Sequence, residues 1–154
     1  MRIALYQPDI AGNVGTILRL GACMGMAVDL IEPLGFAWSD RALARSGMDY
    51  AAQVDVTRHA DWDAFQAQAL DRIVLLTTGG ATPIPAARFR RDDILLFGRE
   101  SAGVPPEVHA RADCRVAIPM VPAMRSLNIA VACGIVLGVA LGQTDQWPSA
   151  AGVG

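Results

Sequence analysis

Three clusters of polar residues in this chain have types and spacings suited to chemistry. The first is Asn13, Gly15 and Arg19 in GNVGTILR, the second is Glu100 in FGRESAGVP, and the third is RSLN at 125–128. Guanidinium and amide groups bind electron-rich atoms, and glycines allow a backbone to approach a ligand closely. The clusters therefore predict a site for a ligand with electron-rich groups such as phosphate.

Each cluster also has an ordinary structural explanation. Asn13 is a typical N-cap for a helix that begins at Val14, and Arg19 is typical of a helix surface. Glu100 suits an exposed turn, and Ser126 stands before a long apolar run, where an N-cap is expected. The residue types by themselves leave structure and function as alternatives.

Two catalytic alternatives use the same residues. GNVG after a strand, with Glu32 about 20 residues further on, imitates a dinucleotide-binding unit, although the third glycine of that pattern is absent. A nicotinamide-dependent oxidoreductase is therefore one alternative. A Ser101 nucleophile needs a general base, and the two histidines, His59 and His109, lie in segments that look unrelated to it.

Strand-like and helix-like segments alternate along the chain. The pattern predicts strands at Arg2–Tyr6, Ala27–Ile31, Gln53–Thr57, Ile73–Thr77, Ile94–Phe97 and Arg115–Ile118. It predicts helices from Val14 to a stop at Gly25, after Asp61 with apolar positions Trp62, Phe65, Ala69 and Leu70, after Pro105, over Ser126–Gly142, and a short one within Gly35–Asp49. This order indicates an α/β fold, with a mainly parallel sheet and helices on both faces.

The polar clusters follow predicted strands. Gln7–Asn13 comes after the first strand, Gly98–Gly103 after Ile94–Phe97, and Val121–Ser126 after the last. Ligands of parallel sheets bind at the carboxyl ends of the strands. We therefore expect the three clusters to meet at one edge of the sheet and to form a single site.

Bulk properties favour a single domain over 1–154, with a flexible tail from about residue 144. The chain has 154 residues, is 53% hydrophobic and carries a net charge of −2, so no overall basic charge indicates a nucleic-acid partner. All thirteen basic residues are arginines. The three cysteines have no metal-ligand spacing, which predicts no metal site, no disulfide framework and a reduced, cytoplasmic setting.

The last predicted helix combines an apolar run with a stripe of glycines. Leu127–Gly142 falls short of the roughly 20 residues that a membrane span needs, so no membrane partner is predicted. Gly134, Gly138 and Gly142 recur at every fourth position, which indicates that another backbone packs closely against them. The predicted partner is a second copy of the chain, and packing on its own sheet is the alternative.

Taken together, the three clusters resemble the SPOUT class of RNA methyltransferases. The matching pieces are NxGxIxR at Asn13–Arg19, FGRESAGVP at Phe97–Pro105 and IPM…RSLNIAVA at Ile118–Ala132. With LIEPLGFAW at Leu30–Trp38, the chain is most similar to the tRNA (cytidine/uridine-2′-O)-methyltransferases that act at the wobble nucleotide. The resemblance covers nearly the whole chain.

This resemblance implies a fold, a cofactor and partners. The fold is an α/β domain with a C-terminal trefoil knot, the cofactor is S-adenosyl-L-methionine, and the partners are the tRNA anticodon stem-loop and a second copy that forms a homodimer. By the family pattern, the cofactor contacts Leu76, Thr77, Gly98, Glu100, Ile118, Met120, Ser126, Leu127 and Asn128. Asn13 and Arg19 are implied to be catalytic and to face the ribose and phosphate of the RNA.

The implied reaction is methyl transfer to the ribose 2′-hydroxyl of the wobble nucleotide, a cytidine or modified uridine at position 34. We expect Arg19 to clamp phosphate and ribose, because a guanidinium pKa above about 12 makes it a poor base. Two positions depart from the family pattern: Ala130 replaces a serine, and Gly138 replaces a bulkier residue. A non-catalytic RNA-binding module of the same fold is the remaining alternative.

Overall fold

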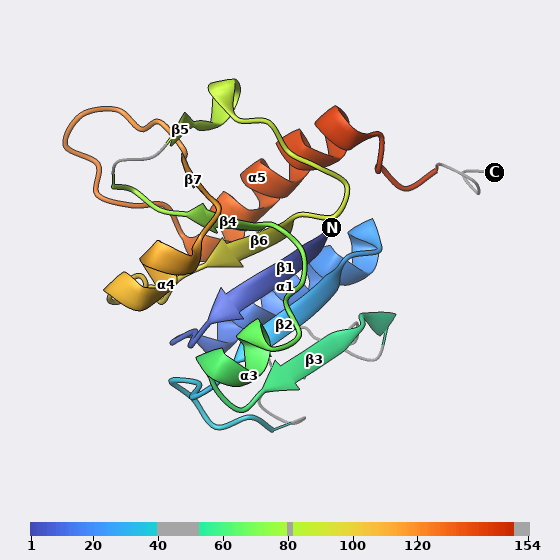
Figure 1. Ribbon diagram of the computed structural model, residues 1–154, viewed down its shortest axis with the longest axis vertical. Helices are drawn as coiled ribbons and strands as arrows, with labels where there is room; N and C mark the ends of the chain where they lie inside the picture. Colours follow the sequence, from blue (N-terminus) through green and yellow to red (C-terminus); the bar gives the residue numbers. More distant parts are fainter. Residues whose placement is uncertain (40–52, 80–81, 150–154) are drawn as a thin grey trace.

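The strands form one sheet in which every neighbouring pair is parallel. The computed structural model describes residues 1–39, 53–79 and 82–149, and its seven strands lie in the order β3-β2-β1-β6-β4-β7-β5 (Figure 1). They are β1 (Arg2–Tyr6), β2 (Ala27–Ile31), β3 (Val56–His59), β4 (Ile73–Leu76), β5 (Thr82–Pro83), β6 (Ile94–Phe97) and β7 (Cys114–Ala117). The predicted parallel sheet is confirmed.

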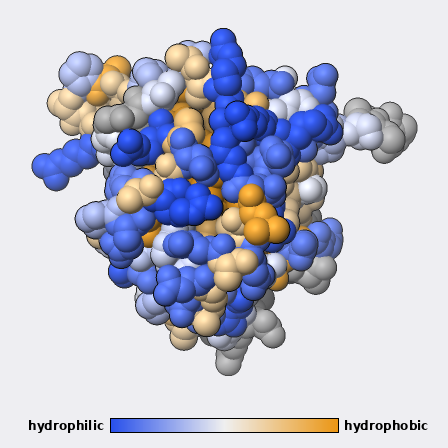
Figure 2. Space-filling model, viewed as in Figure 1, coloured by the Kyte–Doolittle hydropathy of each residue, from blue (hydrophilic) through white to orange (hydrophobic). Residues whose placement is uncertain are grey.

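Helices cover both faces of this sheet, as predicted. α1 (Ala11–Met24) and α5 (Ile129–Thr144) pack on one face (Figure 1). α3 (Trp62–Gln66) and α4 (Pro106–Arg111) pack on the other, and the short η2 (Ile84–Ala86) follows β5. Figure 2 shows the α3/α4 face, where hydrophilic side chains cover most of the surface.

Each face of the sheet has its own apolar core, because successive strand residues point to opposite faces. Ile3 and Leu137 belong to the core under α1 and α5. Ala4, next to Ile3 along β1, belongs to the core under α3 and α4 together with Phe65 and Val108. The continuous apolar runs of the central strands are therefore buried on both sides.

The strand order brings the three predicted loops to one edge of the sheet. β1 pairs with β6, β6 with β4, and β4 with β7. Parallel strands end at the same edge, so the segments 7–10, 98–105 and 118–128 leave the sheet side by side. This arrangement depends on pairings between strands that are distant in sequence.

Some predicted boundaries are wrong. The strand predicted at Gln53–Thr57 is β3, which begins three residues later. Asp61 caps α3 as predicted and accepts a hydrogen bond from the Ala64 N–H at 2.7 Å, but the helix ends at Gln66. The chain must turn there to enter β4, and Leu70 is consequently 92% exposed instead of packing on the helix. Most of the short helix predicted within Gly35–Asp49 lies outside the described residues, and 35–39 contain none.

α1 begins earlier than predicted. Its first residue is Ala11 and Ile10 occupies the N-cap position, so Asn13 lies in the first turn and is not an N-cap. The helix ends at Gly25 as predicted. The φ of Gly25 is 66°, a left-handed conformation that glycine adopts without steric cost.

α5 buries one side and leaves another side open. Cys133 and Leu137 are buried, but the glycine stripe does not pack on the sheet. A Cβ added at Gly134 would meet nothing within 4 Å, whereas one added at Gly138 or Gly142 would lie 3.6–4.0 Å from the Trp147 ring. Trp147 therefore covers part of the stripe. None of the described helices, the 16-residue α5 included, is long and apolar enough to cross a membrane.

Gly21 of α1 packs closely against Met26 and against β2. Gly21→Ala should lower the free energy of unfolding by about 1–3 kcal/mol, because the added methyl would lie 2.8 Å from the Met26 carbonyl oxygen and 2.9 Å from Val28 Cγ2. Gly12→Ala in the same helix is the matched control. Its Cβ would meet nothing within 4 Å, and losing a helical glycine favours the folded state. Urea denaturation measures both variants, and equal stability would contradict this packing.

Candidate functional site

A cavity of about 610 Å³ opens at the carboxyl edge of the sheet. The segments after β1, β4, β6 and β7 form its walls with the start of α5. It is lined by every residue predicted to contact the cofactor: Leu76, Thr77, Gly98, Glu100, Ile118, Met120, Ser126, Leu127 and Asn128. Asn13 lines it too, but Arg19 lies outside the lining, on the exposed surface of α1. What these residues do toward a ligand stays a prediction.

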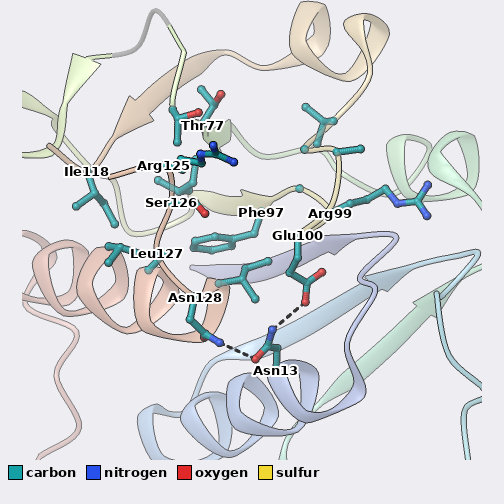
Figure 3. Close-up of a pocket in the computed structure, with 18 of the residues that line it drawn as sticks. Asn13, Thr77, Phe97, Arg99, Glu100, Ile118, Arg125, Ser126, Leu127 and Asn128 are labelled. Atoms are coloured by element: carbon teal, nitrogen blue, oxygen red, sulfur yellow. Dashed lines mark hydrogen bonds between the residues drawn. The ribbon is translucent and has the colours of Figure 1, made fainter. Parts of the chain in front are cut away.

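Three polar side chains form a hydrogen-bonded chain across this cavity (Figure 3). Asn128 Nδ2 donates to Asn13 Oδ1 at 2.9 Å, and Asn13 Nδ2 donates to Glu100 Oε1 at 3.1 Å. The other Glu100 oxygen accepts a hydrogen bond from the Asp9 backbone N–H at 2.9 Å. These hydrogen-bonded side chains join the start of α5, the first turn of α1 and the loop after β6.

The orientation of the Asn128 and Asn13 amides is fixed by their hydrogen-bond partners. Asn128 Oδ1 accepts hydrogen bonds from the N–H groups of Ala130 at 2.9 Å and Val131 at 3.3 Å, so its amide nitrogen must face Asn13. Ionised Glu100 only accepts, so Asn13 must also present its nitrogen to the carboxylate. An amide nitrogen carries two hydrogens, and the described residues provide an acceptor for only one of those on Asn13. The other is available to a ligand in the cavity.

Asn128, and not Ser126, is the N-cap of α5. The prediction of a helix over Ser126–Gly142 is wrong at its start, because the helix begins at Ile129. Residues 118–128 instead form an extended loop that turns at Ala123, whose φ is 75°. Ser126 is thereby placed in the cavity wall. The N–H of Ala130 is satisfied by the cap, although a serine is expected at that position from the family pattern.

A second set of contacts holds the loops after β1 and β6 together. The Asp9 carboxylate accepts hydrogen bonds from Ser101 Oγ at 2.6 Å and from the Ser101 N–H at 3.0 Å, and it pairs with Arg99 at 3.2 Å. These hydrogen bonds, chiefly those from Ser101, lower the pKa of Asp9 below its ordinary value of 3.8. The Ser101 hydroxyl is thus bonded to a carboxylate, which leaves the nucleophile alternative without a histidine base at that oxygen.

The loop after β6 is a tight, closed turn. The N–H of Arg99 donates to the Gly103 carbonyl at 2.9 Å, and the Gly103 N–H donates to the Arg99 carbonyl at 2.8 Å. A Cβ at position 98 would lie 2.7 Å from the Gly103 carbonyl carbon, and the φ of Gly103 is 67°. A side chain at position 98 would clash with the backbone of Gly103, and the positive φ of Gly103 favours glycine, so these two glycines allow the turn that presents Glu100.

The structure also places residues in or beside the site that were not expected there. His109 lines the cavity from α4, so its segment is not unrelated to the site. α4 begins directly after the FGRESAGVP loop, and this short distance along the chain was the available signal. Asp9 lies in the predicted Gln7–Asn13 cluster but was not singled out, because an acid in a turn has no distinctive pattern of its own. Its partners, Arg99 and Ser101, are remote in sequence.

Comparison with known proteins decides the family. Residues 1–138 match the SpoU rRNA methylase family. The chain belongs to the SpoU rRNA methylase family. A relative from Beijerinckia indica subsp. indica, named tRNA (cytidine(34)-2′-O)-methyltransferase, is 56% identical over 144 residues, which cover 92% of this chain and 90% of the relative. A relative of the same name from Escherichia coli K12 is 41% identical over 140 residues, covering 89% of each chain.

Solved structures agree with this family. One that concerns the 2-OH methylation of C/U34 on tRNA has a TM-score of 0.87 at 41% identity and covers 92% of this chain and 94% of that chain. An AdoMet-bound rRNA methyltransferase from Sinorhizobium meliloti has a TM-score of 0.82 at 26% identity and covers 92% of this chain and 55% of that chain. The prediction of a SPOUT-type methyltransferase fold is confirmed.

The nicotinamide alternative is wrong for this SpoU methylase. In a dinucleotide-binding unit the glycines form the turn before the helix. Here Gly12 and Gly15 both lie inside α1, and the GNVG sequence forms its first turns. The glycines that shape the site belong instead to the loop after β6.

The lowered pKa of Asp9 predicts a pH-dependent contribution to stability. Because the folded state favours the ionised carboxylate, the contribution is complete above the ordinary pKa of 3.8 and is lost as the pH falls through the lower, folded-state pKa. Wild type should therefore be more stable than Asp9→Asn at pH 5–7, and the difference should shrink below about pH 4. Denaturation at a series of pH values measures it. A difference that does not change with pH would contradict the lowered pKa.

Proposed function

We propose that this SpoU family member transfers a methyl group from S-adenosyl-L-methionine to the ribose 2′-hydroxyl of nucleotide 34 in tRNA, a cytidine or a modified uridine. The observation that carries the proposal is that residues from all three motif clusters line one cavity. The names of the relatives support the tRNA substrate, and the AdoMet-bound neighbour supports the cofactor. A cytoplasmic location stays a prediction.

The cavity suits the proposed cofactor in size and in lining. Its volume of about 610 Å³ is within the range of roughly 300–1,000 Å³ typical of small-molecule sites. Apolar side chains and the backbone near Gly98 suit a flat base, and hydroxyl and amide groups suit the polar parts. The proposed cofactor contacts are Leu76, Thr77, Gly98, Glu100, Ile118, Met120, Ser126, Leu127 and Asn128. When bound, the cofactor supplies an electrophilic methyl group on a sulfonium.

The residues of the chain are proposed to act by alignment and by charge. Asn13 presents its remaining N–H to the ribose, in an orientation held by Asn128 and Glu100. Holding the hydroxyl in line with the methyl group removes much of the entropic barrier. Arg19 clamps the RNA phosphate and stabilises the negative charge that develops on the ribose oxygen. Unpaired anticodon bases are accessible to such an enzyme because they can be turned out of the stack.

We infer from the strand order that the C-terminal part of the chain is knotted. β7 lies between β4 and β5, although β5 follows β4 directly in sequence. The chain therefore leaves the carboxyl end of β7 between β4 and β5 before it reaches α5. This geometry supports the trefoil knot that the resemblance implies.

We infer that a second copy of the chain covers the exposed side of α5. Val131 and Ile135, one helical turn apart, are 51% and 40% exposed, and Leu127 is 40% exposed beside the cavity. An exposed apolar stripe of this kind is typical of an interface. The open space at Gly134 allows a close approach of a partner backbone. Arg19 does not line the cavity of its own chain, which supports a site completed across the subunit interface.

The purified protein should bind S-adenosyl-L-methionine in calorimetry and transfer its methyl group to unmodified tRNA. Nucleoside mass spectrometry of the product should find the 2′-O-methyl group at position 34. Absence of cofactor binding by folded protein would contradict the proposal. Binding of tRNA without any transfer would favour the non-catalytic RNA-binding alternative.

Arg19→Ala separates the two proposed roles within that experiment. It should leave the cofactor affinity unchanged, because Arg19 lies outside the cavity lining, and should reduce transfer by at least about 100-fold. Arg90→Ala, another exposed arginine, at the opposite edge of the sheet, is the control and should transfer normally. Loss of cofactor binding in Arg19→Ala would refute this assignment.

Ile135→Asp should convert a homodimer into a monomer, because it places a charge in the apolar stripe of α5. Sedimentation or light scattering measures the mass. Leu70→Asp is the matched control, because Leu70 is 92% exposed and lies away from α5. A wild-type monomer, or an Ile135→Asp variant that stays dimeric, would contradict the proposed interface.

A further inference from the structure

We propose that Asp9 is a positioning residue for methyl transfer, which acts on Asn13 through Glu100 and does not touch the ligand. The proposal rests on the proposed function and adds a residue outside the cavity lining to its machinery. It is carried by the reciprocal contacts between the loops after β1 and β6.

Each of the two loops donates a backbone N–H to a carboxylate of the other loop. The Asp9 N–H donates to Glu100 Oε2 at 2.9 Å, and the Ser101 N–H donates to Asp9 Oδ2 at 3.0 Å. The Asp9 N–H thus fixes the Glu100 carboxylate directly. The Asp9 carboxylate fixes the backbone of Ser101, the residue that follows Glu100. With Oε2 held by Asp9, Oε1 is directed to Asn13 Nδ2 at 3.1 Å.

Position 9 requires a carboxylate. Oδ2 accepts both the Ser101 N–H and the Ser101 hydroxyl, at 3.0 and 2.6 Å. Oδ1 accepts from Arg99 Nε at 3.4 Å and Arg99 Nη2 at 3.2 Å. An asparagine has only one acceptor oxygen, so its NH₂ group would face a donor on one of these sides. Asp9→Asn therefore breaks the contacts of residue 9 with either Ser101 or Arg99, while it changes the side-chain volume little.

The contacts of Asp9 with Arg99 and Ser101 are also connected to the end of β1. Arg99 Nη1 donates to Gln7 Oε1 at 3.3 Å, and Gln7 Nε2 donates to the Glu32 carbonyl at 3.3 Å. The φ of Gln7 is 44°, a left-handed conformation that side-chain contacts must offset. Figure 3 shows that Arg99 extends away from Asn13 and Asn128. Arg99 contributes to the cavity lining, and its guanidinium is paired with the Asp9 carboxylate at 3.2 Å.

A positioning role predicts a defined kinetic signature. Asp9 does not line the cavity, so Asp9→Asn should leave KM for S-adenosyl-L-methionine and for tRNA within about threefold of wild type. A small displacement of Glu100 and Asn13 should lower kcat by about 10- to 100-fold. Asp92→Asn, an exposed aspartate at the opposite edge of the sheet, is the matched control and should keep the wild-type kcat.

A double-mutant cycle with Glu100→Gln tests whether Asp9 acts through Glu100. If it does, Asp9→Asn should lower kcat in the wild-type background but by less than about threefold in the Glu100→Gln background. An equal fold loss in both backgrounds would overturn the proposal, and so would a wild-type kcat or a raised KM with unchanged kcat. Wild-type protein without transfer would instead refute the proposed function, which keeps the two failures distinct.

A milder variant covers the case in which Asp9→Asn does not fold. Ser101→Ala removes only the hydroxyl hydrogen bond at 2.6 Å and leaves the backbone hydrogen bond at 3.0 Å in place. It should lower kcat by about threefold to tenfold with unchanged KM, and the decrease should disappear in the Glu100→Gln background. A wild-type kcat in Ser101→Ala would overturn the proposal.

Discussion

The Glu100 carboxylate accepts hydrogen bonds from the Asp9 N–H and the Asn13 amide, which lie 91 and 87 residues away from it in sequence. The rest of the site depends on this contact. β1 and β6 are neighbouring parallel strands, so their following loops start side by side. The carboxylate then connects these loops with charge-assisted hydrogen bonds, which are stronger than bonds between neutral groups. The direction of the Asn13 amide follows from it.

The start of α5 provides the other end of the same arrangement. The first N–H groups of a helix have no partners within the helix, and Asn128 satisfies two of them with one oxygen. The Asn128 nitrogen is consequently directed to Asn13. An amide held at both ends between helix donors and a carboxylate has only one satisfied orientation. The polar centre is thus organised by contacts within the protein itself.

α5 has two different tasks. Its buried side, with Cys133 and Leu137, completes the core under the sheet, and burial raises the pKa of the Cys133 thiol to about 12. Its exposed apolar side, with Val131 and Ile135, follows Leu127, which lines the cavity. A helix that is apolar all round is explained when both sides are covered. This links the proposed second copy to the site, because the same helix supports both.

Local sequence patterns were sufficient to predict the fold class and several individual features. The apolar runs of β1, β4 and β6, the helix stop at Gly25 and the cap at Asp61 depend on neighbouring residues, so a single sequence reveals them. The lining of the cavity was anticipated by the resemblance to a family and not by periodicity. The order of the strands, the cap at Asn128 instead of Ser126, and the contact of Asp9 with Ser101 became visible only in the folded chain. The strand order and the contact of Asp9 with Ser101 depend on groups brought together from distant parts of the chain, and the energy of such contacts leaves no local pattern in a single sequence. The cap at Asn128 is made with nearby N–H groups, but Ser126 and Asn128 are both typical N-cap residues, so their types alone do not select one.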